Sequence, residues 1–176
     1  MIKSANIVRV LLTGRPRSGK TTAVQRVVAG FPGRAAGFFT REVRQGGRRV
    51  GFEIVTLEGQ VSLLSHVDFS GPLRVGKYRV NLDNLHQVAL PAMAPAPDID
   101  LIVVDEIGKM ECLSPRFIAA MERLWAAPVS VLATVAAKGS GYIRAVKQKP
   151  GIIMMTINLQ NRERVPAQLL SLLGPP

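Results

Sequence analysis

The stretch TGRPRSGKTT, residues 13–22, places two glycines, a lysine and two threonines directly after an apolar run. Residues 7–13 are apolar on both alternating faces, as expected for a strand buried in a parallel sheet. After the stretch, apolar residues at spacings of three and four predict a helix that stops near Gly30. The order of strand, glycine loop and helix predicts a phosphate-binding loop in an α/β fold.

The loop matches the Walker A pattern G-x-x-x-x-G-K-[ST]. Glycine turns let several backbone N–H groups converge on a polyphosphate, and the helix N-terminus adds positive potential. Lys20 is expected to reach the β- and γ-phosphates, Thr21 to ligate Mg²⁺, and Thr22 to contact a phosphate further along. The side chains of Arg15 and Arg17 are expected to face solvent. The expected nucleotide-binding residues are Gly14, Arg15, Pro16, Arg17, Ser18, Gly19, Lys20, Thr21 and Thr22.

A second buried strand, DLIVVDE at residues 100–106, ends in two carboxylates. Asp105 is expected to hold Mg²⁺ or its water ligand. Glu106 is expected to polarise a water for attack on the γ-phosphate, which favours hydrolysis over transfer; the alternative is a capping or salt-bridging acid. Thr134 is either a γ-phosphate contact or a buried threonine bonded to backbone. Lys109 is either near the γ-phosphate or a solvated loop lysine.

The remaining pattern completes one expected domain over residues 1–176, with a mostly parallel sheet covered on both faces and antiparallel hairpins inserted after the first βα unit. Met154 and Met155 are expected to fill gaps in the core. The expected elements are hairpin turns near residues 45–47 and 58–59, an unstructured connection at 91–98, a helix from about 115 to 125 capped by Ser114, strands at 129–135 and 151–157 with a short basic helix between them, and a last helix at about 165–173 ended by Gly174 and two prolines.

The chain is basic, with 23 Lys and Arg against 12 Asp and Glu and a formal net charge of +11. This charge favours anionic ligands, and we expect a solvated arginine-rich surface rather than a nucleic-acid site. Cys112 is the only cysteine, so no internal disulfide forms. No apolar run is long enough to span a bilayer, and we expect a cytoplasmic protein. His66 and His86 are assigned no catalytic role.

With these motifs in view, the sequence resembles the THEP-type nucleoside-triphosphatases, also called cancer-related nucleoside-triphosphatases, over most of the chain. The resemblance rests on the loop and on four further segments. These are residues 37–59, residues 66–82, VVDEIGKMEC at residues 103–112, and the pair Asn161-Arg162.

The resemblance implies a RecA-like P-loop fold and slow, Mg²⁺-dependent hydrolysis of ATP, GTP, CTP and UTP with little choice of base. It implies that residues 14–22 bind the nucleotide and that Asp105 and Glu106 are the metal-binding and water-activating pair. Lys20 would act with Glu106 in catalysis. Arg162 would lie beside the base or the phosphates.

The chain departs from the family pattern at Arg17, where glycine usually follows the loop proline, and at Asn84 and His86, where acids are expected. Base preference and rate are therefore left open. Two other functions also stay open: a nucleotide or small-molecule kinase whose acceptor binds residues 41–49, and a nucleotide-switched module that binds nucleic acid. The sequence predicts neither the oligomeric state nor whether an arginine finger comes from this chain or from a partner.

Overall fold

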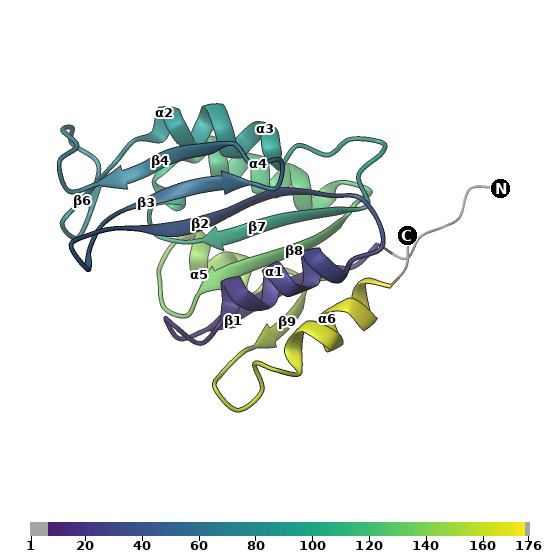
Figure 1. Cartoon of the computed structure of the whole chain (residues 1–176). Coiled ribbons are helices and arrows are strands. Elements are labelled where there is room, and N and C mark those ends of the chain that lie inside the picture. The colour runs from purple at the N-terminus through teal and green to yellow at the C-terminus, as the bar shows by residue number, and fades with distance from the viewer. Residues whose placement is uncertain (1–6, 175–176) are drawn as a thin grey trace.

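The computed structural model describes residues 7–174 and contains nine strands in that range. They are β1 (Arg9–Gly14), β2 (Ala35–Gln45), β3 (Arg48–Thr56), β4 (Val61–His66), β5 (Arg74–Val75), β6 (Tyr78–Val80), β7 (Leu101–Ile107), β8 (Ser130–Ala136) and β9 (Ile153–Thr156). They form one sheet in the order β5-β6-β4-β3-β2-β7-β8-β1-β9 (Figure 1). The strands from β2 to β9 in this order are parallel, and β3, β4, β6 and β5 extend the sheet antiparallel. The α/β prediction, with hairpins inserted after the first βα unit, is confirmed.

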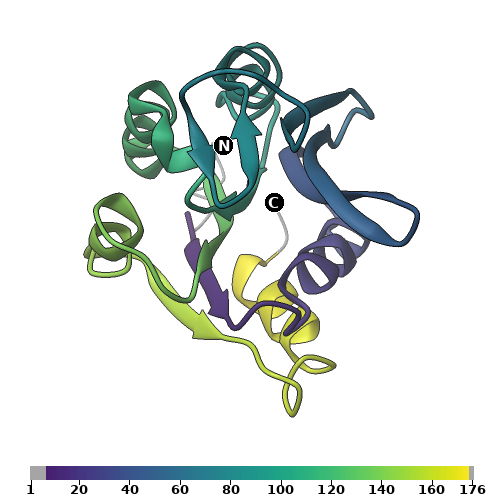
Figure 2. The same cartoon turned by 90° about the vertical axis from the view of Figure 1, so that its left-hand side faces the viewer.

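Helices cover both faces of the sheet (Figures 1 and 2). One face carries α1 (Lys20–Gly30) and α6 (Val165–Leu173), whose apolar residues share a core with β1 and β7. The other face carries α4 (Pro115–Ala126), α5 (Tyr142–Val146) and a helical segment made of α2 (Leu82–Asn84), the π-helical turn η1 (Leu85–Ala89) and α3 (Leu90–Ala92). A short 3₁₀ helix, η2 (Glu111–Leu113), precedes α4.

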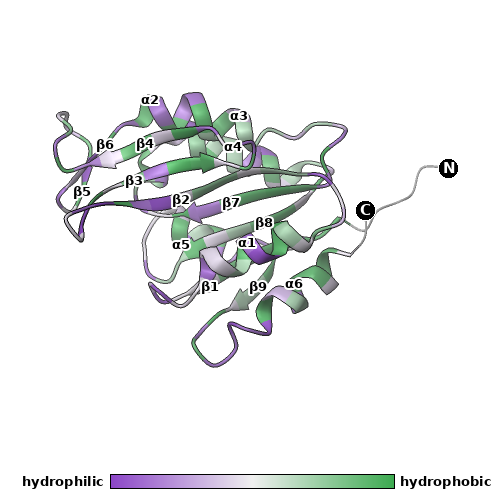
Figure 3. Ribbon diagram, in the orientation of Figure 1, coloured by the Kyte–Doolittle hydropathy of each residue, from purple (hydrophilic) through white to green (hydrophobic). Residues whose placement is uncertain are grey.

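Strand β1 shows why the first apolar run has no polar face. Val10 and Leu12 are fully buried against α1 and α6, while Leu11 is fully buried in the core on the opposite face. Each side chain therefore lies under a helix layer, and alternation between apolar and polar residues is not needed. Figure 3 shows the hydrophobic colour on this central part of the sheet and hydrophilic residues towards the tip of the β2–β3 hairpin.

Local signals set several boundaries as expected. Ser114 caps α4, since its Oγ accepts a hydrogen bond from the N–H of Phe117 at 3.0 Å, and Pro115 follows at the first helical position. Gly46 and Gly47 both have positive φ in the turn between β2 and β3. Helix α6 ends at Gly174, with φ 65°. The two final prolines and the segment before Ile7 lie outside the described residues.

Two expectations were wrong in part. The strand expected at 151–157 is present as β9, but it lies at the edge of the sheet, and the side chains of Ile153 and Met154 are 42% and 40% exposed. Met154 therefore does not fill a core gap, whereas Met155 is partly buried and packs against the core under α1 and α6. Among the described residues, β9 has a neighbouring strand on one side only. The connection expected at 91–98 begins two residues later: Pro91 and Ala92 belong to α3, while residues 93–98 form neither helix nor strand.

Within residues 7–174, none of the helices combines the length and the apolar character that a membrane crossing needs.

Candidate active site

Strands β1, β7 and β8 are parallel, so their carboxyl ends meet at one edge of the sheet. The register places Leu12 of β1 beside Thr134 of β8, and Asp105 of β7 beside Phe39 of β2. The loop before α1 begins at this edge, which faces the viewer in Figure 2. Ligands of open α/β sheets bind outside the carboxyl ends of the strands, so this edge is the place to look for a site.

The loop from Gly14 to Gly19 turns tightly between β1 and α1. A Cβ atom at Gly14 would lie 2.4 Å from the carbonyl oxygen of Ile157 and 2.6 Å from Oγ of Ser18, so only glycine fits there. The loop closes with a hydrogen bond from the N–H of Ser18 to the carbonyl of Arg15 at 3.1 Å. Gly19, with φ 98°, leads into the first turn of α1. The N-terminus of α1 therefore points its free N–H groups into the loop.

Lys20 extends over the loop from the first turn of α1. Its Nζ donates hydrogen bonds to the carbonyl oxygens of Gly14 at 3.1 Å and Arg15 at 3.4 Å. The same Nζ lies 4.0 Å from Oε2 of Glu106. A single ammonium group thus connects the loop to a carboxylate of β7.

Asp105 is 1% exposed, and both of its carboxylate oxygens accept hydrogen bonds from threonine hydroxyls. Thr21 donates to Oδ2 at 2.6 Å, and Thr134 donates to Oδ1. Burial raises the pKa of Asp105, while the hydrogen bonds from Thr134 and Thr21 and the charge of Lys20 partly oppose that rise. The hydroxyl of Thr134 thus bonds to a carboxylate, not to backbone.

Glu106 is the second carboxylate at this edge and is partly exposed. Burial is the main cause that raises its pKa; the charge of Lys20 lowers the pKa and the charge of Asp105 raises it. A carboxylate with a raised pKa is a stronger base than one in water. Glu106 thus lies beside the loop and forms a weak ion pair with Lys20.

Glu111, a third carboxyl group, was not singled out from the sequence. It is 4% exposed in η2, and its Oε2 accepts a hydrogen bond from the N–H of Gly108 at 3.1 Å. A Cβ at Gly108 would lie 2.8 Å from this oxygen and 3.0 Å from Oε1 of Glu106, so the two carboxyl groups flank the same glycine. Burial, followed by the charge of Glu106, raises the pKa of Glu111 to about 8. The available signal was a third acid within the motif DEIGKME.

Arg162 lies on the other side of the loop from β7, in the segment between β9 and α6. Asn161 fixes this segment: its Nδ2 donates to the carbonyl of Thr156 and its Oδ1 accepts from the N–H of Asn158, both at 2.8 Å. The Cδ of Arg162 lies 3.7 Å from the position that a Cβ of Gly19 would take. The structure thus brings Arg162 to the loop, with its side chain about half exposed.

The other candidates lie further from the carboxylates. Arg15, Arg17 and Thr22 are exposed, as expected for the two arginines. Arg17 has φ 64°, a left-handed conformation in which glycine is favoured. Lys109 is exposed on the loop after β7.

Each histidine, in contrast, has a close partner that sequence spacing did not reveal. His86 Nε2 lies 2.7 Å from Oγ of Ser114, which is 28 positions away in the chain. The Nδ1 of His66 lies 3.5 Å from Oδ2 of Asp68. The Ser114 hydroxyl already caps α4, so the contact with His86 is part of the helix start.

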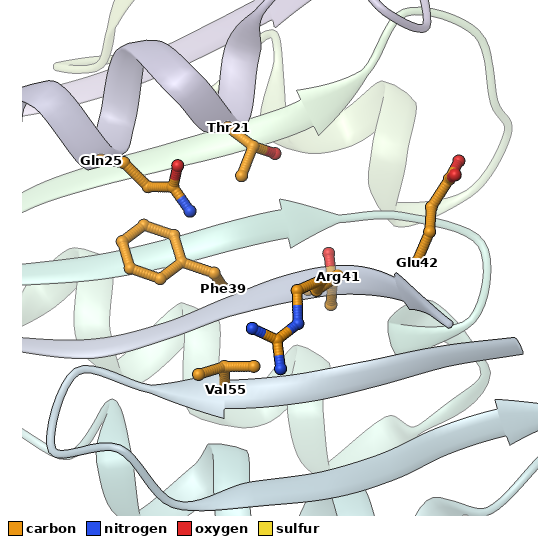
Figure 4. Close-up of a pocket in the computed structure, with 7 residues that line it drawn as sticks. Thr21, Gln25, Phe39, Arg41, Glu42 and Val55 are labelled. Carbon is orange, nitrogen blue, oxygen red and sulfur yellow. The ribbon is translucent and has the colours of Figure 1, made fainter. Parts of the chain in front are cut away.

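A pocket of about 280 Å³ opens beside Thr21, between α1 and the β2–β3 hairpin. Figure 4 shows Thr21 and Gln25 on α1 facing Phe39 and Arg41 on β2 and Val55 on β3. Two of its lining residues, Arg41 and Glu42, belong to the segment 41–49 that the kinase alternative assigns to an acceptor. The walls from α1 and β3 were not found from the sequence, because their packing is visible only in three dimensions.

Comparison with known proteins gives consistent results. A family model described as NTPase matches residues 9–170. A protein of Thermotoga petrophila named nucleoside-triphosphatase THEP1 is 36% identical over 167 residues, which cover 94% of this chain and 93% of that protein. A mouse protein named cancer-related nucleoside-triphosphatase homolog is 37% identical and covers 87% of this chain and 90% of its own length. The crystal structure of THEP1 from Aquifex aeolicus superposes with a TM-score of 0.86 at 32% identity, covering 94% of this chain and 99% of the other.

Proposed function

The chain belongs to the nucleoside-triphosphatase family, and we propose that it hydrolyses nucleoside triphosphates to diphosphate and phosphate at the loop between β1 and α1. The observation that carries this proposal is the meeting of two distant segments. The Nζ of Lys20 on α1 lies 4.0 Å from Oε2 of Glu106 on β7. The Oγ1 of Thr21, the next residue of α1, lies 2.6 Å from Oδ2 of Asp105. Phosphate-binding and carboxylate groups are thus held at one edge of the sheet.

The residues at this edge fit a magnesium ion. Mg²⁺ prefers oxygen ligands and needs only one or two protein groups besides phosphate and water. Thr21 Oγ1 and the Asp105 carboxylate supply such oxygens and already lie in hydrogen-bond contact. A buried carboxylate also calls for a nearby positive charge. Thr21 and Asp105 would hold the ion, which would supply charge neutralisation for the β- and γ-phosphates.

The protein's own groups have distinct roles in the proposed reaction. The backbone N–H groups of the loop and the Lys20 ammonium bind the phosphates, and Lys20 stabilises the charge that develops on them. Glu106 accepts a proton from the attacking water. The water oxygen bonds to the γ-phosphorus as the bond from this phosphorus to the bridging oxygen breaks, and the nucleoside diphosphate leaves. Thr134 holds the Asp105 carboxylate in place through its hydroxyl.

Base recognition is proposed to be weak. The side chain that the structure brings beside the loop on the β9 side is Arg162, which is about half exposed. A guanidinium group can stack on any base because every base presents a π-face. We therefore propose that ATP, GTP, CTP and UTP are all substrates.

The test is phosphate release from each of these four triphosphates in the presence of Mg²⁺, with the parent protein, Lys20→Ala and Glu106→Gln. Loss of the base is expected to lower kcat by about 10²–10⁴-fold while nucleotide binding remains. Lys20→Ala is expected to weaken both binding and turnover. Glu58→Gln and Lys77→Ala, which change exposed residues away from the loop and its carboxylates, are the matched controls. Absence of phosphate release by the parent, or a Glu106→Gln variant as active as the parent, would refute the proposal.

A further inference from the structure

The pocket beside Thr21 lies at the opposite side of the loop from Arg162. In the sheet order, β9 and β2 lie on opposite sides of β1, β8 and β7. Arg162 follows β9, whereas the pocket is built on β2 and on the α1 side of Thr21. Thr21 also donates a hydrogen bond to Asp105 of β7. Asp105 is the register partner of Phe39 on β2, which lines the pocket. With the base beside Arg162, the γ-phosphate end of the nucleotide would face this pocket.

The lining of the pocket combines an apolar floor with polar walls. Phe39 and Val55 are register partners across β2 and β3 and present their side chains to the same face. Gln25, an exposed residue of α1, brings an amide group to the opposite wall. These two groups suit a flat, polar ring system, which can pack on the Phe39 ring and form hydrogen bonds with the Gln25 amide.

The charges in the lining are already paired. Arg41 forms an ion pair with Glu53 at 2.5 Å. Glu42 forms ion pairs with Arg44 at 2.6 Å and with Arg49 at 2.7 Å. A charged ligand would compete with these partners, whereas a neutral ligand would leave them intact. The volume of about 280 Å³ is close to the lower limit of about 300–1,000 Å³ for small-molecule sites, so the ligand is small.

We propose that this pocket binds a neutral nucleoside, whose primary hydroxyl group competes with water for the γ-phosphoryl group. The inference rests on the proposed function, because the donor is the triphosphate held by the loop. The hydroxyl oxygen forms a bond to the γ-phosphorus, and the bond from that phosphorus to the bridging oxygen breaks. The hydroxyl proton passes to the Glu106 carboxylate. The products are a nucleoside monophosphate and the nucleoside diphosphate of the donor.

The experiment incubates the parent protein with Mg²⁺ and ATP labelled in the γ-phosphate, together with adenosine, guanosine, cytidine, uridine or thymidine in turn. Chromatography then separates labelled phosphate from labelled nucleoside monophosphate. At least one nucleoside is expected to become labelled, with a matching decrease in free phosphate. The variant Gln25→Ala removes one hydrogen-bonding group from an exposed position and is expected to lower transfer about tenfold while hydrolysis stays unchanged.

Two more variants locate the acceptor. Phe39→Leu keeps an apolar side chain in the fold but removes the ring, and is expected to lower transfer as well. Gln168→Ala, on the exposed side of α6, is the matched control and is expected to behave as the parent.

The outcomes separate the two proposals. Hydrolysis without label in any nucleoside overturns the acceptor site and leaves the proposed function standing. Transfer that Gln25→Ala and Phe39→Leu do not change overturns the placement of the acceptor in this pocket. Neither hydrolysis nor transfer means that the donor site is wrong, and the inference fails with it.

Discussion

Replacement of Glu111 by glutamine is expected to change how the stability of the protein depends on pH. Glu111 is buried beside Glu106 and accepts a hydrogen bond from Gly108. Glutamine keeps an oxygen acceptor for that N–H group but carries no titrating proton. Glu106 and Asp105 titrate in both proteins, so the difference between parent and variant reports the titration of Glu111 together with its coupling to these two carboxylates.

The magnitude follows from the pKa of Glu111, which burial raises from 4.5 to about 8. Below pH 4.5 the carboxyl group is protonated in the folded and the unfolded chain, and its burial has no titration cost. As the pH rises from 4.5 to 8, the unfolded chain loses the proton while the folded protein keeps it, so the parent loses stability by about 1.4 kcal/mol per pH unit. The total loss is on the order of 5 kcal/mol by pH 8, a large part of the stability of a typical domain.

The assay is urea unfolding of parent and Glu111→Gln at pH 5 and pH 8, followed by the fluorescence of Trp125, the only tryptophan. The variant is expected to exceed the parent by less than about 1 kcal/mol at pH 5 and by several kcal/mol at pH 8. Glu58→Gln, at an exposed turn position, is the control and should show little change at either pH. The reasoning is refuted if the difference between parent and Glu111→Gln stays the same at the two pH values within about 0.5 kcal/mol.

Three further predictions concern the metal and the backbone. Removal of divalent cations with EDTA is expected to abolish phosphate release, and Mg²⁺ should restore it in the parent but not in Asp105→Asn; full activity in EDTA would contradict the proposed ion. Gly37→Ala should lower the free energy of unfolding by more than about 4 kcal/mol in chemical denaturation, because Gly37 has φ 125° and a Cβ there would lie 1.9 Å from the carbonyl oxygen of Val103. Gly46→Ala should lower it by about 1 kcal/mol, because a Cβ at Gly46 would have no atom within 4 Å. Equal effects of the two substitutions would show that the close approach of β2 and β7 is not limiting. Arg17→Gly should raise the stability by about 1 kcal/mol in thermal melting, because φ 64° is unfavourable for arginine, and a lower melting temperature would contradict this.

The parts of the fold that sequence predicted well are those set by local chemistry. The loop after β1 needs glycine at Gly14 for space, and Ser114 caps α4 with its own side chain, so both features are visible in a few adjacent residues. The glycine that the resemblance leads one to expect after Pro16 also has a local explanation, since Arg17 occupies a left-handed conformation.

The missed parts depend on contacts between distant segments. The exposure of Met154 follows from the place of β9 at the end of the sheet order, and an apolar run of that length does not reveal its neighbours. Glu111 is buried because η2 folds back onto Gly108, and a lone acid in a sequence normally predicts exposure. The pocket combines Gln25 with Phe39, which become neighbours only when β2 pairs with β7 and α1 packs above it.

Strand β9 lies at the edge of the sheet beside β1, the strand that leads into the phosphate loop. Within residues 7–174 no strand pairs with the outer N–H and C=O groups of β9, so β9 is expected to exchange its amide hydrogens earlier than the central strands β1, β8 and β7. The residue that follows β9, Ile157, donates its N–H to the carbonyl of Thr13 at 2.8 Å, and its own carbonyl oxygen lies close to Gly14. Fraying of β9 would therefore break the hydrogen bond from Ile157 to Thr13 at the start of the loop. A bound triphosphate that immobilises the loop should, by thermodynamic reciprocity, protect β9 against fraying.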